Sequence, residues 1–234
     1  MQITWLGHST FLIETSGAGG KRIVTDPWLS NPNAPAAFQK PEALGKLDLI
    51  LVSHGHSDHI GDLIALARAS GAPVSCLFEL GQWLEQKGVQ NIRDMGIGGT
   101  QEVNGIRLTM TPAVHSGSYM DNGSIVYLGG AAGYIVRIPD APVFYFAGDT
   151  ALFGDMKILR DLYRPEIAFL PIGDHYTMGP DTAALAAEWL GVRQVVPMHW
   201  GTFPLLTGTP AALKDHIASK GIAVLELEPG ERTE

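Results

Sequence analysis

Short apolar runs, separated by Gly, Pro, Asn and Asp, recur along the whole chain. Runs of this length with turn residues at their ends predict β-strands. The pair Asn104 and Gly105, which lies between two of these runs, is a strong signal for a β-hairpin. The predicted strands are Gln2–Leu6, Phe11–Thr15, Arg22–Thr25, Asp48–Ser53, Pro73–Leu77, Thr100–Asn104, Ile106–Pro112, Gly133–Ile138, Val143–Ala147, Ile167–Pro171, Gln194–Met198 and Ile222–Leu227.

Between these strands, apolar residues at helical spacing predict α-helices. The first half of the chain is richer in hairpins, whereas the second half alternates strand and helix. This order favours an α/β protein in which two sheets pack face to face with helices outside. The predicted helices are Gly61–Ala69, Leu80–Gln86, Ala151–Leu162, Asp181–Leu190 and Pro210–Ser219.

Two segments lack a regular pattern. Pro27–Pro41 is rich in Pro, Asn and Ala, and Ser116–Ala132 is rich in Gly. Each is long for a simple connection, so each is a candidate lid or substrate loop. A solvated surface loop explains the first segment equally well. The second begins beside His115, which favours a functional loop.

Composition excludes several classes of function. The 234 residues carry a formal net charge of −8, and Lys and Arg are not clustered. Non-specific binding to nucleic acid or to an anionic membrane requires such clusters. No run approaches the roughly 18 apolar residues of a membrane span, and Met1–Trp5 does not resemble a signal peptide. The only cysteine, Cys76, lies in an apolar segment and is predicted to be a buried structural thiol. These features favour the cytoplasm.

Three histidines and one aspartate occur within six consecutive residues, directly after the predicted strand Asp48–Ser53. They would stand on a loop at the carboxyl end of a strand, where α/β proteins place active sites. Imidazole and carboxylate suit zinc, and carboxylates also admit manganese or iron. The four side chains are His54, His56, Asp58 and His59.

The same arrangement recurs three times. His115, Asp149 and His199 each follow an apolar run within one or two positions; the runs are Leu108–Val114, Phe144–Ala147 and Val195–Met198. Parallel strands would bring such ends together at one edge of a sheet. The complete set of five histidines and two aspartates is sufficient for two metal ions. Spacing alone leaves open how these side chains divide between the ions.

The segment Ser53–His59 resembles the histidine-rich signature of the metallo-β-lactamase superfamily, and His115, Asp149 and His199 match its later ligands in order. The resemblance implies a four-layer αββα sandwich. Because it spans residue 1 to about 228, we expect one domain over residues 1–234. It also implies one metal set of His54, His56 and His115, a second set of Asp58, His59 and His199, and a bridging Asp149.

Further motifs are similar to a narrower branch of this superfamily, the metal-dependent hydrolases of bacteria and archaea that are related to ascorbate-6-phosphate lactonases. N-acylphosphatidylethanolamine phospholipase D is a more distant relative of the branch. Asp174 and His175 depart from the branch pattern, because we expect a small or different side chain at His175. This departure affects the polarity of the pocket. The branch motifs are Trp5–Thr10, Thr25–Trp28, Pro171–Gly173 and Tyr176–Pro180.

The resemblance implies a hydrolase in which two divalent metal ions activate a water that cleaves a small ester, lactone or phosphodiester. Five histidines favour zinc, while manganese, nickel or iron are alternatives. The expected partner is a small molecule, and the charge of two metal ions would admit an anionic one. Neither nucleic acid nor a membrane is an expected partner, whereas homo-oligomers are known among the relatives.

Among the candidate catalytic residues, Asp58 is expected to orient the water and to pass a proton. His8 and His175 are not needed as ligands, so each is a candidate hydrogen-bond donor to substrate or a general acid, or else a structural histidine. Asp26 is expected to hold a ligand histidine or the ligand loop through a hydrogen bond, unless it is only a turn residue before Pro27.

Three alternative functions have less support from the sequence than metal-dependent hydrolysis. Nucleic-acid processing by a nuclease occurs in the superfamily, but the formal net charge of −8 opposes it. Di-iron redox members carry a carboxylate at the position of His56 and a flavin module, for which this chain has no room. A metal-binding protein without activity is opposed by the complete ligand set.

Overall fold

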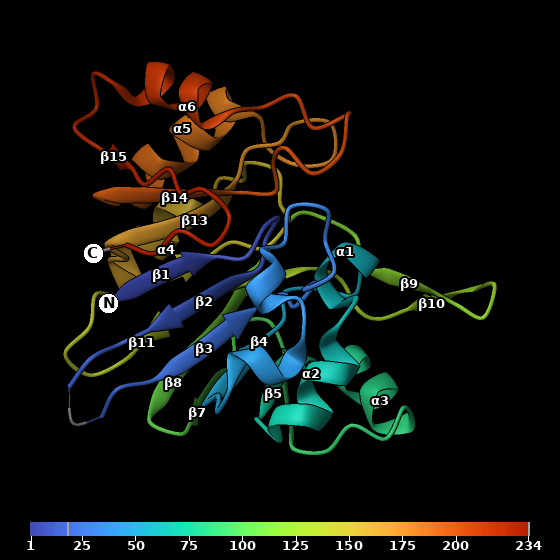
Figure 1. Cartoon of the computed structure of the whole chain (residues 1–234). Coiled ribbons are helices and arrows are strands. Elements are labelled where there is room, and N and C mark those ends of the chain that lie inside the picture. The colour runs from blue at the N-terminus through green and yellow to red at the C-terminus, as the bar shows by residue number, and fades with distance from the viewer. Residues whose placement is uncertain (18, 234) are drawn as a thin grey trace.

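A computed structural model describes residues 1–17 and 19–233 of the chain. Two mixed β-sheets lie face to face (Figure 1). In the first sheet, β1 to β3 pair antiparallel and β3 to β6 pair parallel. The strands of this sheet are, in order, β1 (Gln2–Trp5), β2 (Phe11–Glu14), β3 (Arg22–Thr25), β4 (Leu49–Leu51), β5 (Val74–Leu77) and β6 (Ile92–Met95).

The second sheet is parallel from β15 to β12 and antiparallel from β12 to β7. Its hairpin β7–β8 turns at Asn104 and Gly105, whose φ angles of 51° and 75° are those of the predicted tight turn. The strands are, in order, β15 (Ala223–Val224), β14 (Gln194–Met198), β13 (Ile167–Pro171), β12 (Phe144–Phe146), β11 (Ala132–Arg137), β8 (Ile106–Pro112) and β7 (Thr100–Val103).

Helices cover the outer face of each sheet, which confirms the predicted αββα order (Figure 1). Helices α2 (Leu63–Ser70) and α3 (Phe78–Gln86) pack on the first sheet, and α4 (Met156–Tyr163), α5 (Pro180–Leu190) and α6 (Pro210–Ile217) cover the second. The short helix α1 (Ser57–Ile60) and the 3-10 helices η1 (Ala36–Phe38) and η2 (Pro41–Leu44) lie in connections of the first half.

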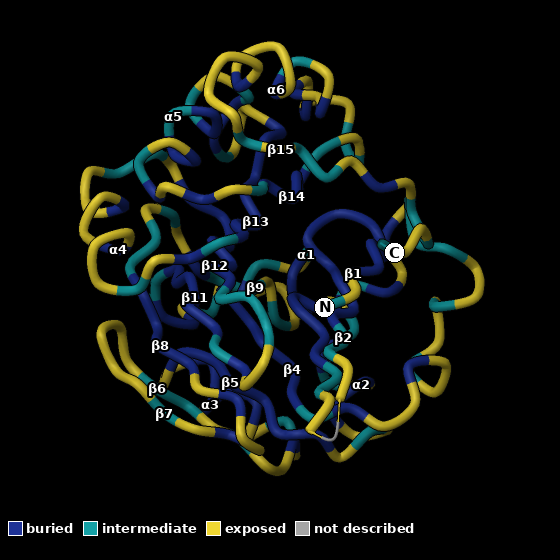
Figure 2. Tube along the Cα trace, turned by 90° about the vertical axis from the view of Figure 1, so that its left-hand side faces the viewer, coloured by how far each residue is buried: buried dark blue, intermediate teal, exposed yellow. Residues whose placement is uncertain are grey.

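Aromatic side chains join the two sheets across the central layer of the core. The ring of Phe169 on β13 lies 5.0 Å from that of Phe11 on β2, and it also contacts Phe144 and Phe146 on β12. Strand residues alternate between the two faces of a sheet. Accordingly, Leu12 faces the helix side of the first sheet while Phe11 faces the second sheet. The strands are largely buried, and exposure is concentrated on helices and loops (Figure 2).

Several predicted boundaries differ from the structure. The segment Ser116–Ala132 is not an irregular loop: it contains a hairpin of β9 (Ser118–Asp121) and β10 (Ser124–Tyr127), which projects from the sandwich (Figure 1). Its exposed apolar residues hide the alternation that would have predicted strands. Strand β6 was missed because this edge strand is short and half polar, and β15 covers only part of the predicted last strand.

Two predictions from composition agree with the structure. Cys76 is fully buried on β5, and burial raises the pKa of its thiol. Among the residues that the structure describes, no helix is long and apolar enough to span a bilayer.

We expect the substitution Phe169→Ala to lower the free energy of unfolding by about 3–5 kcal/mol, because it removes a ring that packs against both sheets. Urea denaturation followed by circular dichroism measures this change. Ile158→Ala on the exposed face of α4 is the control and should stay within about 0.5 kcal/mol of the unmodified protein. Equal effects of the two substitutions would contradict the central role of Phe169.

Candidate metal centre

The predicted ligands converge because four strands end at one edge of the sandwich. His54 follows β4 of the first sheet, whereas His115, Asp149 and His199 follow β8, β12 and β14 of the second. Strands β8 and β12 are both antiparallel to β11, so they run in the same direction, and β14 is parallel to β12 through β13. Their carboxyl ends therefore meet.

Three imidazoles form the first group. His56 immediately precedes α1, and its Nδ1 lies 2.9 Å from Nε2 of His54 and 3.3 Å from Nε2 of His115. One ring nitrogen from each of these residues lies within 4.8 Å of the others. His54 is fully buried, and His56 and His115 are partly exposed at the opening of the site.

The second group combines two histidines and a carboxylate. Oδ2 of Asp58 lies 3.6 Å from Nε2 of His199 and 3.9 Å from Nε2 of His59. Asp58 and His59 are consecutive residues of α1, while His199 comes from the far end of the sequence. His8 belongs to the same cluster.

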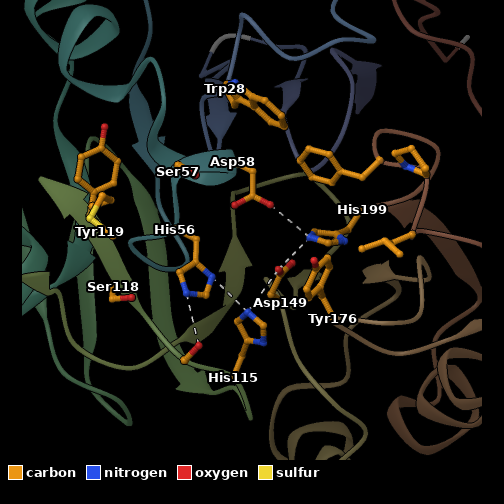
Figure 3. A pocket seen from close by; sticks show the side chains of 15 residues that line it. Trp28, His56, Ser57, Asp58, His115, Ser118, Tyr119, Asp149, Tyr176 and His199 are labelled. Carbon is orange, nitrogen blue, oxygen red and sulfur yellow. Dashed lines mark hydrogen bonds and ion pairs between the residues drawn. The ribbon is translucent and has the colours of Figure 1, made fainter. Parts of the chain in front are cut away.

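Asp149 lies between the two groups (Figure 3). Its Oδ2 is 3.0 Å from Nε2 of His199 and 3.3 Å from that of His59. The same oxygen is 3.6 Å from Nε2 of His115 and 3.9 Å from that of His54. One carboxylate thus contacts two histidines of each group.

The unsatisfied polar atoms of the site fit a bound cation. Nε2 of His59 and Oδ1 of Asp149 are buried, and neither has a hydrogen-bond partner among the described residues. Buried polar atoms are normally paired, so each such exception needs an explanation. Nitrogen and carboxylate oxygen atoms that point at a common space are suitable ligands for a divalent metal ion.

The ionisation of the histidines differs between the groups. Burial lowers the pKa values of His54, His56 and His115, so these rings are neutral and keep a lone pair for a metal. Burial opposes the charge of His59 and His199 as well, but the carboxylate of Asp149 overcomes this effect. It raises the pKa of His59 well above its usual value and that of His199 to about 9.

The two ligand carboxylates stay ionised despite burial. His199 and His59 hold the pKa of Asp149 well below its usual value, and His59, together with hydrogen bonds from His199 and His8, does the same for Asp58. The second group therefore favours positive charge, whether protons or a metal ion carry it.

Asp26 orients one histidine of each group. Its Oδ2 accepts a hydrogen bond from Nδ1 of His59 at 2.7 Å and another from Oγ of Ser53 at 2.6 Å, and its Oδ1 accepts from the Ser53 backbone at 2.7 Å. Oγ of Ser53 in turn accepts from Nδ1 of His54 at 3.0 Å. Because both histidines carry their proton on Nδ1, both present Nε2 to the site. The predicted role of Asp26 is confirmed, and that of Ser53 was missed.

Three buried residues of the site adopt left-handed backbone conformations: His8 has a φ of 53°, Asp26 of 34° and His199 of 55°. Such conformations are rare for residues other than glycine and cluster at functional sites. The neighbouring backbone holds them, since the amide of His199 donates to the carbonyl of His8. The carbonyl oxygen of His199 lies so close to Gly173 that a Cβ at position 173 would be 2.1 Å from it, so the loop after β13 requires glycine there.

The structure places His8 behind Asp58 and out of the pocket lining. It is fully buried, with Nε2 3.1 Å from Oδ2 of Asp58 and Nδ1 2.9 Å from Oγ1 of Thr202. Burial lowers the pKa of His8 to about 4, so the ring is neutral. Nε2 must carry the proton, since an ionised carboxylate can only accept. This geometry favours contact with Asp58 over contact with substrate.

His175 is not brought to the ligand cluster. The chain turns away after β13 through two left-handed residues, Asp174 and His175. The exposed His175 ring packs against Tyr176, whose ring centroid is 4.4 Å away, and only Tyr176 lines the pocket. A catalytic role for His175 remains a prediction that this position does not support.

A cavity of about 850 Å³ opens over the ligand cluster. Trp28 comes from the segment Pro27–Pro41, and Tyr119 and Met120 come from β9, so both segments predicted to border a substrate contribute walls. The loop Phe203–Leu205 forms another wall, which the sequence did not indicate because Phe203 resembles a packing residue. Trp200, which follows His199, does not line the cavity, because its ring stacks on that of Trp5 with centroids 4.9 Å apart.

Comparison with known proteins agrees with this geometry. The family model described as a beta-lactamase superfamily domain matches residues 21–200. The chain belongs to the metallo-β-lactamase superfamily. Relatives within the superfamily include a UPF0173 metal-dependent hydrolase of Solibacter usitatus, which is 48% identical and aligns over 99% of this chain and 98% of its own length.

A second relative, from Methanopyrus kandleri, has the same description and is 42% identical over the full length of both chains. Among solved structures, Igni18, a metallo hydrolase from the archaeon Ignicoccus hospitalis, is 36% identical with a TM-score of 0.87. That match covers 99% of this chain and 97% of Igni18. This metallo-β-lactamase superfamily member therefore belongs to a family of metal-dependent hydrolases.

We expect Asp26→Asn to weaken metal binding by about 10- to 100-fold, because an amide cannot accept from Ser53 and His59 as a carboxylate does. Competition with a chromogenic chelator measures the affinity. Asp62→Asn is the matched control, since Asp62 also accepts two hydrogen bonds, both from Ser30, but lies outside the site. Equal metal affinity of Asp26→Asn and the control would contradict the orienting role.

Proposed function

We propose that the chain binds two divalent metal ions and uses a water activated by them to hydrolyse a small ester, lactone or phosphodiester. The position of Asp149 carries this proposal: its Oδ2 lies within 3.9 Å of four histidine nitrogens, two from each ligand group. A carboxylate between two histidine groups is suited to bridge two cations.

The residues divide naturally between the ions. His54, His56 and His115 would hold one ion and Asp58, His59 and His199 the other. When bound, the ions lower the pKa of water from about 16 toward about 7 and polarise the bond to be cleaved. Five histidines support zinc as the native metal, and manganese, nickel or iron can use the same ligands.

Asp58 is the best-placed residue to orient water and to move a proton. It lines the cavity, and its strongly lowered pKa keeps it ionised as an acceptor. His8 donates Nε2–H to Oδ2 of Asp58, and Thr202 donates its hydroxyl to Nδ1 of His8. These contacts direct the carboxylate toward the cavity, so we assign His8 to the positioning of Asp58.

Purified protein should contain about two metal ions per chain. Asp149→Ala should reduce this content to about one or less, because it removes the carboxylate that contacts histidines of both groups. Elemental analysis after gel filtration measures the stoichiometry. Unchanged occupancy would contradict a bridging role for Asp149.

Asp58→Asn should lower hydrolysis by about 100-fold or more while leaving the fold intact, because the amide can no longer accept a proton. Lactones, thioesters, phosphodiesters and nucleotides, each assayed with zinc and with manganese, provide the reaction to be followed, and circular dichroism checks the fold. If turnover persisted in Asp58→Asn, Asp58 would have no part in the mechanism.

A further inference from the structure

The walls of the cavity differ chemically from its floor. The floor is the cluster of histidines and aspartates, whereas Trp28, Tyr119 and Tyr176 stand around that cluster on separate sides (Figure 3). Apolar side chains complete the walls, among them Met120 and Leu205, which are 60% and 50% exposed. Exposed apolar atoms that gather around a polar centre are typical of a ligand site.

Packing behind each wall holds it in place. The rings of Trp28 and Phe203 stack with centroids 5.8 Å apart, and both pack edge-on against His8, at 5.3 Å and 5.7 Å. This wall therefore rests on the residue that also contacts Asp58. His8 therefore contacts both the aromatic pair of the wall, Trp28 and Phe203, and the candidate catalytic residue Asp58.

The opposite wall is anchored to α3. The ring of Tyr119 lies 5.3 Å from that of Trp83, whose Nε1 donates to Oδ2 of Asp121 at 3.1 Å. Lys87 contacts the same Oδ2 at 2.6 Å. Strand β9 is thus fixed where it borders the cavity, and the charge of Lys87 is already paired with Asp121.

The described walls offer no lysine or arginine side chain that could pair with an anionic group of a substrate. The uncharged polar residues of these walls include Ser57, Ser116, Ser118, Tyr119 and Tyr176. The acids Asp58 and Asp149 also line the cavity, at the ligand cluster, where His199 faces both of them. An anionic group remote from the metals would lose its hydration without gaining a counter-charge, which is costly.

We infer that the substrate joins its hydrolysable bond to an uncharged aliphatic or aromatic group, which the walls bind while the bond lies at the metal ligands. The volume of about 850 Å³ suits a substrate of drug-like size. The inference rests on the proposed hydrolytic function and deepens it. It argues against sugar phosphates and nucleic acids, whose remaining charges would face these walls.

Three p-nitrophenyl esters test the inference: the acetate, the hexanoate and the mono-ester of adipate, which extends like hexanoate but ends in a carboxylate. We expect kcat/KM for the hexanoate to exceed that for the acetate by about tenfold or more, because the walls bury its methylene groups. The adipate ester should fall below the hexanoate by a similar factor. An adipate ester as good as the hexanoate, or no gain from acetate to hexanoate, would overturn the inference.

Substitutions at Met120 test whether this wall causes the preference for an uncharged acyl group. Met120→Lys should raise the ratio of adipate to hexanoate turnover by about tenfold, since it supplies the missing counter-charge, whereas Met120→Gln, of similar length without charge, should not. Leu162→Lys adds the same charge to exposed helix α4 and should leave all three rates unchanged. An unchanged ratio in Met120→Lys would contradict the assignment of this wall.

Failure of the proposed hydrolytic function and failure of the inference about the walls give different results. Acetate carries no extended group, so failure to hydrolyse the acetate ester and bis-p-nitrophenyl phosphate, with zinc or manganese, would contradict the proposed function. Calorimetric binding of free acetate, hexanoate and adipate to the metal-loaded protein tests the walls without turnover. Tighter binding of hexanoate than of the other two supports the inference, and equal binding of all three overturns it.

Discussion

The hydrogen bonds of one buried carboxylate, Asp26, orient a histidine in each of the two ligand groups. They connect the turn after β3, the loop after β4 and helix α1, and they leave Nε2 of both His54 and His59 facing inward. Burial raises the pKa of Asp26, and the neighbouring His59 opposes that rise. The carboxylate is therefore stable as an anion only while its donors surround it, and the ligand geometry and the charge balance depend on each other.

The ligands could be predicted from the sequence because four of them cluster in one short segment after an apolar strand, the other three each follow an apolar run, and parallel strand ends meet at an edge. The positions of His8 and His175 could not, because left-handed turns aim them, and a hydrophobic pattern carries no information about such turns. The hairpin β9–β10 escaped prediction for a related reason. Met120, Ile125 and Tyr127 are exposed, and Tyr119 and Val126 are only partly buried against the core, so no buried periodicity marks the strands.

The sandwich separates the chemistry of the site from the shape of its cavity. Strand ends and α1 supply the ligands, whereas the segment with Trp28, the hairpin β9–β10 and the loop with Phe203 supply the walls. Loops tolerate substitution better than the elements that they connect. A family that keeps the ligand residues can therefore change its substrates through the walls without rebuilding the metal centre.

The ligands also come from both sheets, with His54 and His59 on the first and His115, Asp149 and His199 on the second. Metal ions held between these groups would act as a cross-link between the two halves of the sandwich. Any ligand that binds only the folded state adds to its stability. An ion held by ligands from both halves would thus oppose local opening of this edge of the sandwich, and its removal should make such opening more frequent.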